Sequence, residues 1–217
     1  MLQELLNALE ETLFMVFTAG LLTWIIGLPL GALLSVTGKN EFLDNPLIHK
    51  PLRTLINATE KVPYIVFMIA IIPLTRIIIG SGEGSVAAVV PLTLASIPYF
   101  AKFSENAINL VPKGLIEAAR AVGASSFQII YKVLIPEALP NIISGLTTIL
   151  THLVGYSTIA GVLGAGGLGS LIIHKGYLSF QTDYVVAIVL TLVLLTQMIQ
   201  SCGNYIANGS LHKNSSA

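Results

Sequence analysis

The sequence predicts an all-α membrane protein, one transmembrane domain over residues 1–217 with five spans and a cytoplasmic helical hairpin between the third and the fourth. Only 10% of its 217 residues are charged, against roughly 25% in an average globular protein, and 54% are apolar. Several charge-free stretches approach the roughly 20 helical residues that cross a hydrocarbon core. We expect spans at about 12–37, 62–79, 84–101, 138–160 and 184–206, and a cytoplasmic loop at about 102–137.

The spans are placed by charge-free runs and by their lengths. Residues 12–38 contain no charged side chain, and 62–79 contain only Arg76 near one end, where a long side chain can reach the headgroups. The run without Asp, Glu, Lys or Arg at 138–174 is too long for one crossing and too short for two with a turn. We therefore assign 138–160 to the fourth span and the remainder to a glycine-rich segment.

Basic residues set the expected orientation, because Lys and Arg are retained on the cytoplasmic side of a membrane. Five spans with an external N-terminus and a cytoplasmic C-terminus place nine basic residues inside and two outside. The nine are Lys39, Lys50, Arg53, Lys61, Lys102, Lys113, Arg120, Lys132 and Lys213. We expect the two, Arg76 and Lys175, to form a solvated rim with Glu83 and Asp183, or to contact an external protein. The inverted topology would reverse this ratio and is disfavoured.

Composition and missing motifs exclude several classes of function. Lys plus Arg equal Asp plus Glu at 11 each, which does not indicate a nucleic-acid-binding surface. The single cysteine, Cys202, excludes an intrachain disulfide, and the spans contain no paired carboxylates and no H-E-x-x-H metal motif. No Walker A sequence is present, so energy from ATP must enter through a partner. We expect no catalytic residue, metal site or cofactor in this chain.

The loop between the third and fourth spans has the pattern of a helical hairpin. Pro112 suits the start of a helix, Gly123 can take the left-handed conformation that ends it, and Ser125 with Gln128 predicts a capping box for a second helix. We expect Pro136 to terminate that second helix. The apolar face of the first helix carries Leu115, Ala118, Ala119 and Val122. Because this face is rich in Ala and lacks Trp and Phe, it favours a groove on a protein over a lipid surface.

Within this hairpin the sequence resembles the EAA loop of ABC-importer permeases. That pattern is E-A-A, three residues, G, nine residues and I-x-L-P. The matching positions are Glu117, Ala118, Ala119, Gly123 and Pro136, with Val133 and Ile135 in place of Ile and Leu. The resemblance rests on the spacing over twenty residues and on the setting between two spans.

The resemblance extends over most of the chain and narrows to the methionine-uptake permeases of ABC importers. It rests on residues 63–76, 89–108, 112–125 and 153–172. It implies a homodimer of this chain in the inner membrane that conducts L- or D-methionine. It also implies two ATP-binding subunits, which carry ATP and Mg, on the cytoplasmic face, and an external protein that delivers the substrate.

The resemblance also implies roles for residues of the hairpin. Glu117 would contact the ATPase, the two alanines after it would permit close approach, and Gly123 would make the turn. Closure of the ATPase dimer would then move the helix as a lever and bias two packings of the bundle. The alternative for Glu117 is pairing with Lys113 and Arg120 along its own helix, worth about 0.2–0.5 kcal/mol per pair.

The glycine-rich segment at 161–170 contains G-A-G-G-L-G, which superficially matches a dinucleotide-binding fingerprint. It follows a membrane span rather than a strand, so close backbone packing or a bend is expected instead. In a carrier, this segment and the fourth span would line the pathway with Tyr156, Ser157 and Ile159. Ile159 is either a hydrophobic gate or an ordinary packing residue. For His152, deep in the same span, we expect a neutral, hydrogen-bonded ring rather than a functional group.

Other classes of function compete with this interpretation. An ABC permease for another amino acid or a quaternary amine is compatible with the same residues. A proton-coupled secondary carrier would normally place Asp or Glu within its spans and often shows sequence repeats, and neither is visible. A membrane-embedded enzyme is disfavoured by the lack of catalytic motifs.

Overall fold

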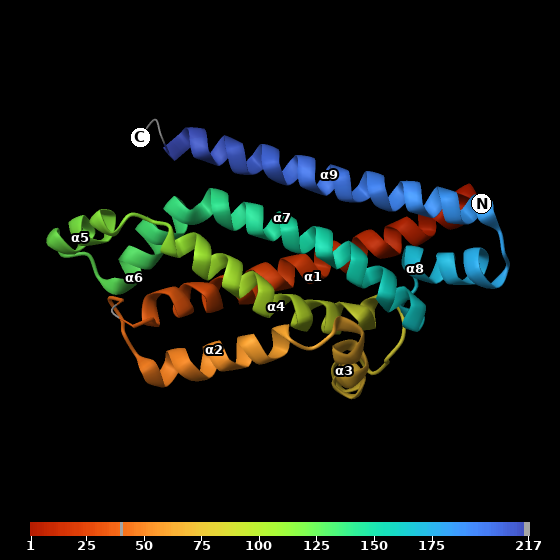
Figure 1. Cartoon of the computed structure of the whole chain (residues 1–217), viewed down its shortest axis with the longest axis horizontal. Helices are drawn as coiled ribbons and strands as arrows, with labels where there is room; N and C mark the ends of the chain where they lie inside the picture. Colours follow the sequence, from red (N-terminus) through yellow and green to blue (C-terminus); the bar gives the residue numbers. More distant parts are fainter. Residues whose placement is uncertain (40, 215–217) are drawn as a thin grey trace. The chain divides into compact units, whose positions relative to one another are not determined.

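The computed structural model describes residues 1–39 and 41–214, with side chains described for 1–39 and 41–209 (Figure 1). Every regular element in these ranges is helical, which confirms the all-α fold class. The elements are α1 (Leu2–Thr37), α2 (Pro46–Glu60), α3 (Tyr64–Ile79), α4 (Ser85–Asn109), α5 (Lys113–Ala121), α6 (Ser126–Ile129), η1 (Ile130–Leu134), α7 (Ile135–Ala160), η2 (Gly161–Ala165), α8 (Gly167–Leu171), η3 (Ile172–Leu178) and α9 (Thr182–Asn214). The side chain of Lys213 and residues 215–217 of the expected domain lie outside the described residues.

Several of these helices are able to span a bilayer. Among the described residues, four are long and apolar enough: Leu2–Thr37, Ser85–Asn109, Ser126–Ala165 and Thr182–Gly209. Helices α2 and α3, separated by a break at residues 61–63, meet the same criterion only as a pair, which would make a fifth span. The multi-pass character of the chain follows, and the number of five spans stays a prediction.

The chain divides into two compact units. The first contains Met1–Thr23, Val62–Ser96 and Thr148–Ser201, and the second contains Trp24–Lys61, Ile97–Thr147 and Cys202–Ala217. Helices α1, α4, α7 and α9 contribute residues to both units. Each unit has buried apolar clusters of its own, including Ala8, Leu168 and Ile188 in the first and Leu34, Ile56 and Ala101 in the second.

Glycines of α1 allow α4 to approach closely in the second unit. A Cβ atom on Gly31 would lie 2.5 Å from the carbonyl oxygen of Ala101, and one on Gly27 would lie 2.9 Å from the ring of Phe100. The same ring stacks on Trp24 with 5.6 Å between centroids. Since a carbonyl oxygen of the backbone cannot move aside, this contact depends on a residue without a side chain.

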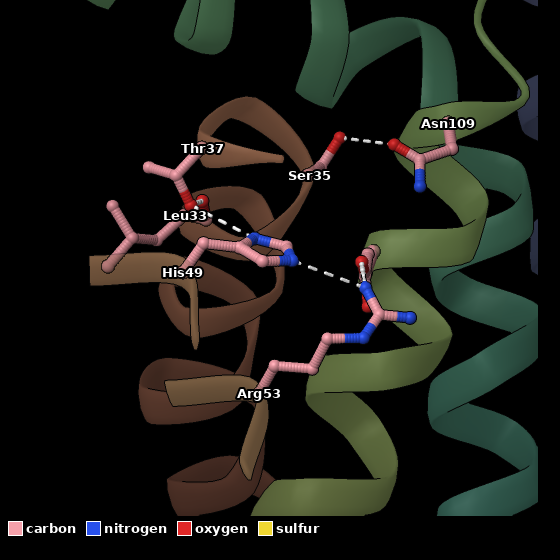
Figure 2. A network of polar contacts seen from close by, with 7 residues as sticks. Leu33, Ser35, Thr37, His49, Arg53 and Asn109 are labelled. Atoms are coloured by element: carbon pink, nitrogen blue, oxygen red, sulfur yellow. Dashed lines mark hydrogen bonds and ion pairs between the residues drawn. The ribbon is translucent and has the colours of Figure 1, made fainter. Parts of the chain in front are cut away.

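Helix α2, which the hydropathy pattern did not predict, packs on α1 and α4 through polar side chains (Figure 2). Arg53 Nη1 donates to Oε1 of Glu105 at 3.0 Å. Nε2 of His49 lies 3.4 Å from the same guanidinium nitrogen, and Nδ1 lies 3.4 Å from the hydroxyl of Thr37. The ring of His49 thus bridges α1 and Arg53, and Arg53 in turn holds α4.

Helix α2 exposes apolar side chains on one side and packs both apolar and polar side chains on the other. Its outer side exposes Leu47 and Leu55, which are 86% and 62% exposed. Its packed side carries the buried Ile56 together with His49 and the half-exposed Arg53, whose carboxylate partner, Glu105, is only 6% exposed. Exposed leucines on the outer side and a charge paired on the packed side are compatible with a helix in contact with lipid.

We expect Glu105→Ala to cost about 1–3 kcal/mol of stability, because it leaves Arg53 without its buried acceptor. The double variant Arg53→Met, Glu105→Met should cost less than the sum of the two single substitutions. Thermal unfolding of the purified protein in detergent measures both effects. Additive losses would contradict a coupled pair.

The second helix of the loop does not end at Pro136, contrary to the expectation from the sequence. The five residues of η1 form a wider, π-helical turn in which the N–H of Ile135 donates to the carbonyl of Ile130. Helix α7 begins at Ile135, so the proline falls in its first turn, where the missing N–H costs little. The chain then stays helical to Ala160, the predicted end of the fourth span. Helix α4 likewise continues beyond the predicted limit at residue 101, to Asn109.

The glycine-rich segment packs backbone against backbone in the first unit, as predicted. A Cβ atom on Gly169 would lie 2.0 Å from the carbonyl oxygen of Thr158, and one on Gly161 would lie 2.5 Å from that of Gly166. Gly164 breaks the helix with φ +97°. These positions require glycine for space or for backbone conformation.

The start of α8 is held by side chains of α1, also in the first unit. Oε2 of Glu11 accepts the N–H of Gly167 at 2.6 Å, and the hydroxyl of Thr12 accepts the N–H of Leu168 at 3.0 Å. The first N–H groups of a helix have no partner within it, so these acceptors fix the fold of the segment.

We expect Glu11→Ala to destabilise the protein by about 1 kcal/mol, because the N–H of Gly167 loses its acceptor. The neighbouring carboxylate gives a matched control, since Glu10 is exposed and Glu10→Ala removes a similar charge. Thermal unfolding of the two purified variants makes the comparison. Equal melting temperatures would contradict the capping role.

Candidate functional site

The hairpin predicted between the third and fourth spans is present as helix, turn and helix in the second unit. Helix α5 follows Pro112, and its C-cap is Val122. The side chain of Ser125 accepts the backbone N–H of Gln128, whose side chain accepts the N–H of Ser125, so the predicted capping box is confirmed. The cytoplasmic location of the hairpin stays a prediction.

Gly123 makes the turn in the left-handed conformation, with φ +82°. Its N–H donates to the carbonyl of Arg120 at 2.9 Å. A Cβ atom at this position would meet nothing within 4 Å. The requirement for glycine therefore comes from the backbone conformation, which disfavours any residue with a side chain, and not from lack of space.

The basic residues of α5 turn towards the connection between α1 and α2. Lys113 Nζ lies 3.3 Å from Oε1 of Glu41. Arg120 donates to the carbonyl oxygen of Phe42 at 3.3 Å, and its guanidinium carbon lies 5.3 Å from the centre of the Phe42 ring. These contacts tie the hairpin to the rest of the second unit.

Glu117 is exposed and makes no ion pair among the described residues. The alternative in which it pairs with Lys113 and Arg120 is therefore not the arrangement found, because both basic side chains are engaged elsewhere. No residue of α5 is buried. The helix exposes this carboxylate and the small side chain of Ala118, while Ala119 is half-buried.

Large apolar side chains are also exposed on this hairpin. Val122 is 84% exposed, Phe127 75% and Tyr131 65%, and the rings of Phe127 and Tyr131 stack with 6.3 Å between centroids. The docking face predicted from the sequence covers only the first helix of the loop and does not include these two aromatic residues. Exposed aromatic side chains beside small residues are typical of a surface that binds protein.

A small recess lies between the hairpin and the rest of the second unit. It has a volume of about 40 Å³ and is lined by residues that include Ser35, Asn109, Lys113 and Ile116. The hydroxyl of Ser35 donates to Oδ1 of Asn109 at 2.6 Å beside it (Figure 2). A space of this size holds water but no substrate. The recess is therefore too small to be a substrate site.

The three residues predicted for the pathway lie near the end of α7, in the first unit. Tyr156 stacks on Tyr64 of α3 with 4.1 Å between ring centroids, a pairing that the sequence did not indicate. Ser157 is buried, and its hydroxyl donates to the carbonyl of Val154 at 2.8 Å. Ile159 is half-buried. In this conformation the polar group of Ser157 is satisfied by its own helix.

His152 lies one turn before Tyr156 and is exposed in this chain. Its ring meets that of Tyr156 edge to face, with 6.5 Å between centroids. Tyr64, Tyr156 and His152 therefore form a short run of rings on α3 and α7 within the first unit.

The predicted basic rim has a partner that the sequence did not suggest. Lys175 Nζ lies 3.1 Å from Oε1 of Glu4 and 5.5 Å from the centre of the Tyr184 ring. The hydrogen bond to Glu4 raises the pKa of Lys175, which keeps the ammonium charged. Arg76, Glu83 and Asp183 are exposed, as expected for a solvated rim.

Comparison with known proteins identifies relatives over nearly the whole chain. Residues 27–207 match the model of the family described as binding-protein-dependent transport system inner membrane component. The probable D-methionine transport system permease protein MetI of Vibrio cholerae is 42% identical, over 96% of this chain and 93% of its own length. The D-methionine transport system permease protein MetI of Escherichia coli K12 is 42% identical, over 74% of each chain.

Solved structures agree with this relationship. A structure titled as an inward-facing conformation of the MetNI methionine ABC transporter superposes with a TM-score of 0.95 at 39% identity, over 97% of each chain. An amino acid ABC transporter crystallised with histidines has a TM-score of 0.77 at 21% identity, and therefore shares the fold. The chain belongs to the family of binding-protein-dependent transport system inner membrane components, the multi-pass permeases of ABC importers.

Proposed function

We propose that this chain is the permease subunit of an ABC importer and conducts methionine into the cytoplasm. The observation that carries the proposal is the hairpin, on which Glu117, with no ion pair among the described residues, is exposed together with Ala118 and a left-handed Gly123, beside the half-buried Ala119. The substrate is supported by relatives named D-methionine permeases at 42% identity and by the methionine transporter at 39%. D-methionine is the substrate in those names, and L-methionine is included in the proposal because both enantiomers share every functional group.

The assembly that we propose contains two copies of this chain, each one permease domain over residues 1–217. Five spans cross the inner membrane with the N-terminus outside, and α2 with α3 forms the second. Two ATP-binding subunits dock on the cytoplasmic hairpins and hold ATP and Mg, while an external binding protein delivers methionine. This chain needs no cofactor and hydrolyses nothing.

In this assembly, Glu117 and the two alanines after it seat α5 in a cleft of the ATPase. Closure of the ATPase dimer moves the hairpin, which Lys113 and Arg120 tie to the second unit. The motion biases two packings of the bundle, one open to each side. The substrate passes Tyr156, Ser157 and Ile159, with Ile159 as the apolar gate.

The test is ATP-driven uptake by a reconstituted complex. The chain is co-expressed with a candidate ABC ATPase, purified through a tag on the ATPase, and placed in proteoliposomes with the binding protein. We expect uptake of labelled methionine only with ATP, Mg and binding protein together. Competition with unlabelled L- and D-methionine then measures the stereochemical range.

Two results would contradict the proposal. If no ABC ATPase co-purifies with the chain, the hairpin is not a docking element. If a proton gradient drives uptake without ATP, the chain is a secondary carrier. Uptake of another amino acid or of a quaternary amine in place of methionine would keep the importer and correct its substrate.

A further inference from the structure

A second ion pair joins α2 to α4, at the point where α2 ends. Lys102 Nζ bonds Oε2 of Glu60, the last residue of α2. The hydroxyl of Tyr99, one turn earlier on α4, donates to the carbonyl oxygen of Glu60 at 2.9 Å. The side chains of Glu60 and Lys102 are 27% and 34% exposed, so one side of the pair is open.

This pair lies within α4, which continues past residue 101, so Lys102 sits inside the helix and not in the cytoplasmic loop where the charge count placed it. Gly27 and Gly31 of α1 pack against the carbonyls of Ile97 and Ala101 on α4, which places Lys102 alongside this part of α1. Residues 12–38 of α1 are free of charge, and residues 27–31 lie about 10–16 Å before the end of that run at 1.5 Å per residue. The run is about 40 Å long and exceeds a hydrocarbon core of about 30 Å by about 5 Å at each end, so the pair lies about 5–11 Å inside the core.

The open side of the pair requires a polar neighbour. Ionised side chains at this depth face a bundle interior or a water-filled cavity, because hydrocarbon does not solvate them. The lipid-compatible side of α2 is elsewhere: Leu55 lies five residues before Glu60, about 140° around the helix, whereas Arg53, which also pairs with α4, lies about 20° from it.

Helix α2 ends at the same depth as the ion pair. Helix α2 ends at Glu60 with Lys61 as its C-cap, and the chain breaks before α3 begins at Tyr64. Helices broken inside the bilayer, with charged groups at the break, are where carriers place substrate sites. The depth of the ion pair and the end of the helix are separate observations that indicate the same position.

We propose that Glu60 and Lys102 bind the zwitterionic main chain of an α-amino acid as it crosses the membrane. The ammonium of Lys102 takes the substrate carboxylate and the carboxylate of Glu60 takes the α-ammonium group. The ion pair between Glu60 and Lys102 is replaced by one ion pair from each of them to the substrate, so binding leaves no charge unpaired. The inference rests on the transport function proposed above and adds the residues that receive the substrate.

The experiment is thiol labelling of the permease–ATPase complex in lipid nanodiscs. Cys202, the only cysteine of the chain, is first replaced by Ser. Glu60→Cys and Lys102→Cys report on the pair, Leu55→Cys is the lipid-side control on α2, and Asn106→Cys is an exposed control one turn from Lys102 on α4. The reagent is the charged sulfonatoethyl methanethiosulfonate, which does not enter hydrocarbon.

We expect Glu60→Cys and Lys102→Cys to react at least about tenfold faster than Leu55→Cys, because only water carries the reagent to them. Methionine should slow labelling of both pair positions several-fold and leave Asn106→Cys unchanged. Methioninol, which lacks the carboxylate, should protect much less. Both Glu60→Cys and Lys102→Cys are tested, so that the proposal can still be judged from one variant if the other does not fold.

Pair positions as unreactive as Leu55→Cys would overturn the proposal and indicate that a second copy of the chain covers them. Equal slowing at Asn106→Cys would also overturn it, because a general closure would then explain protection. ATP-driven uptake by the Leu55→Cys complex is measured in parallel. If this complex takes up methionine while Glu60→Cys and Lys102→Cys are unreactive or unprotected, the importer function is kept and only the substrate-binding role of the pair is rejected. If this complex takes up no methionine, the proposed function itself is rejected.

Discussion

Replacing Gly169 by Ala is expected to prevent the first unit from packing. The new Cβ atom would lie 2.0 Å from the carbonyl oxygen of Thr158 and 2.7 Å from its Cα atom. Both are backbone atoms, so no rotamer change relieves the overlap. The cost should reach or exceed about 3 kcal/mol, at the upper end for overpacking. Size-exclusion chromatography and thermal unfolding in detergent measure the loss of folded protein.

A glycine on α7 provides the matched control for this substitution. Gly155 has nothing within 4 Å of an added Cβ atom and lies in a regular helix. Gly155→Ala should leave stability unchanged or raise it by up to about 1 kcal/mol, since Ala is the better helix former. If Gly169→Ala unfolds at the same temperature as Gly155→Ala, the close contact between α8 and the end of α7 is wrong.

Replacing Glu117 by Arg is expected to abolish ATP-driven uptake while the permease remains folded. The side chain is exposed and has no ion pair among the described residues, so its loss removes nothing from the fold. A cation in place of the carboxylate would oppose docking, and we expect uptake to fall at least about tenfold, equivalent to 1.4 kcal/mol. Co-purification with the ATPase, uptake and the unfolding temperature are measured together.

Gly123→Val tests the same hairpin through its backbone. Valine at φ +82° is strained by about 1–2 kcal/mol, so the angle between α5 and α6 should change and coupling should fall. Gly114 on α5 is the control, because an added Cβ atom meets nothing within 4 Å and its φ is not in the left-handed range. Normal uptake by Glu117→Arg and Gly123→Val would show that the ATPase docks elsewhere.

Charge-free length was enough to predict the long helices, because hydrocarbon imposes it directly on the sequence. The cores of α1, α4, α7 and α9 were predicted in this way. Their ends were not, because α4 stays helical through Lys102 and Glu105, whose charges are paired with α2. A charge marks the end of a span only when it has no partner at that depth.

Local rules predicted the hairpin and failed at Pro136. The capping box at Ser125 and the turn at Gly123 depend on residues three or fewer positions apart, and both were predicted correctly. The π-helical turn that accommodates Pro136 has no known short sequence signal, so the expected helix stop was wrong. The contact of Tyr64 with Tyr156 joins residues far apart in the chain, so local sequence patterns could not predict it.

The ion pairs between α2 and α4 have a consequence for biosynthesis. Residues 46–60 leave the ribosome before their partners, which follow 42 residues later for Lys102 and 52 residues later for Glu105. Until then Arg53 and Glu60 lack counter-charges, and each would cost about 3 kcal/mol at the centre of an inserting helix. We therefore expect this segment to wait outside the hydrocarbon and to enter only with α4, so a chain truncated before residue 102 should leave it exposed to protease.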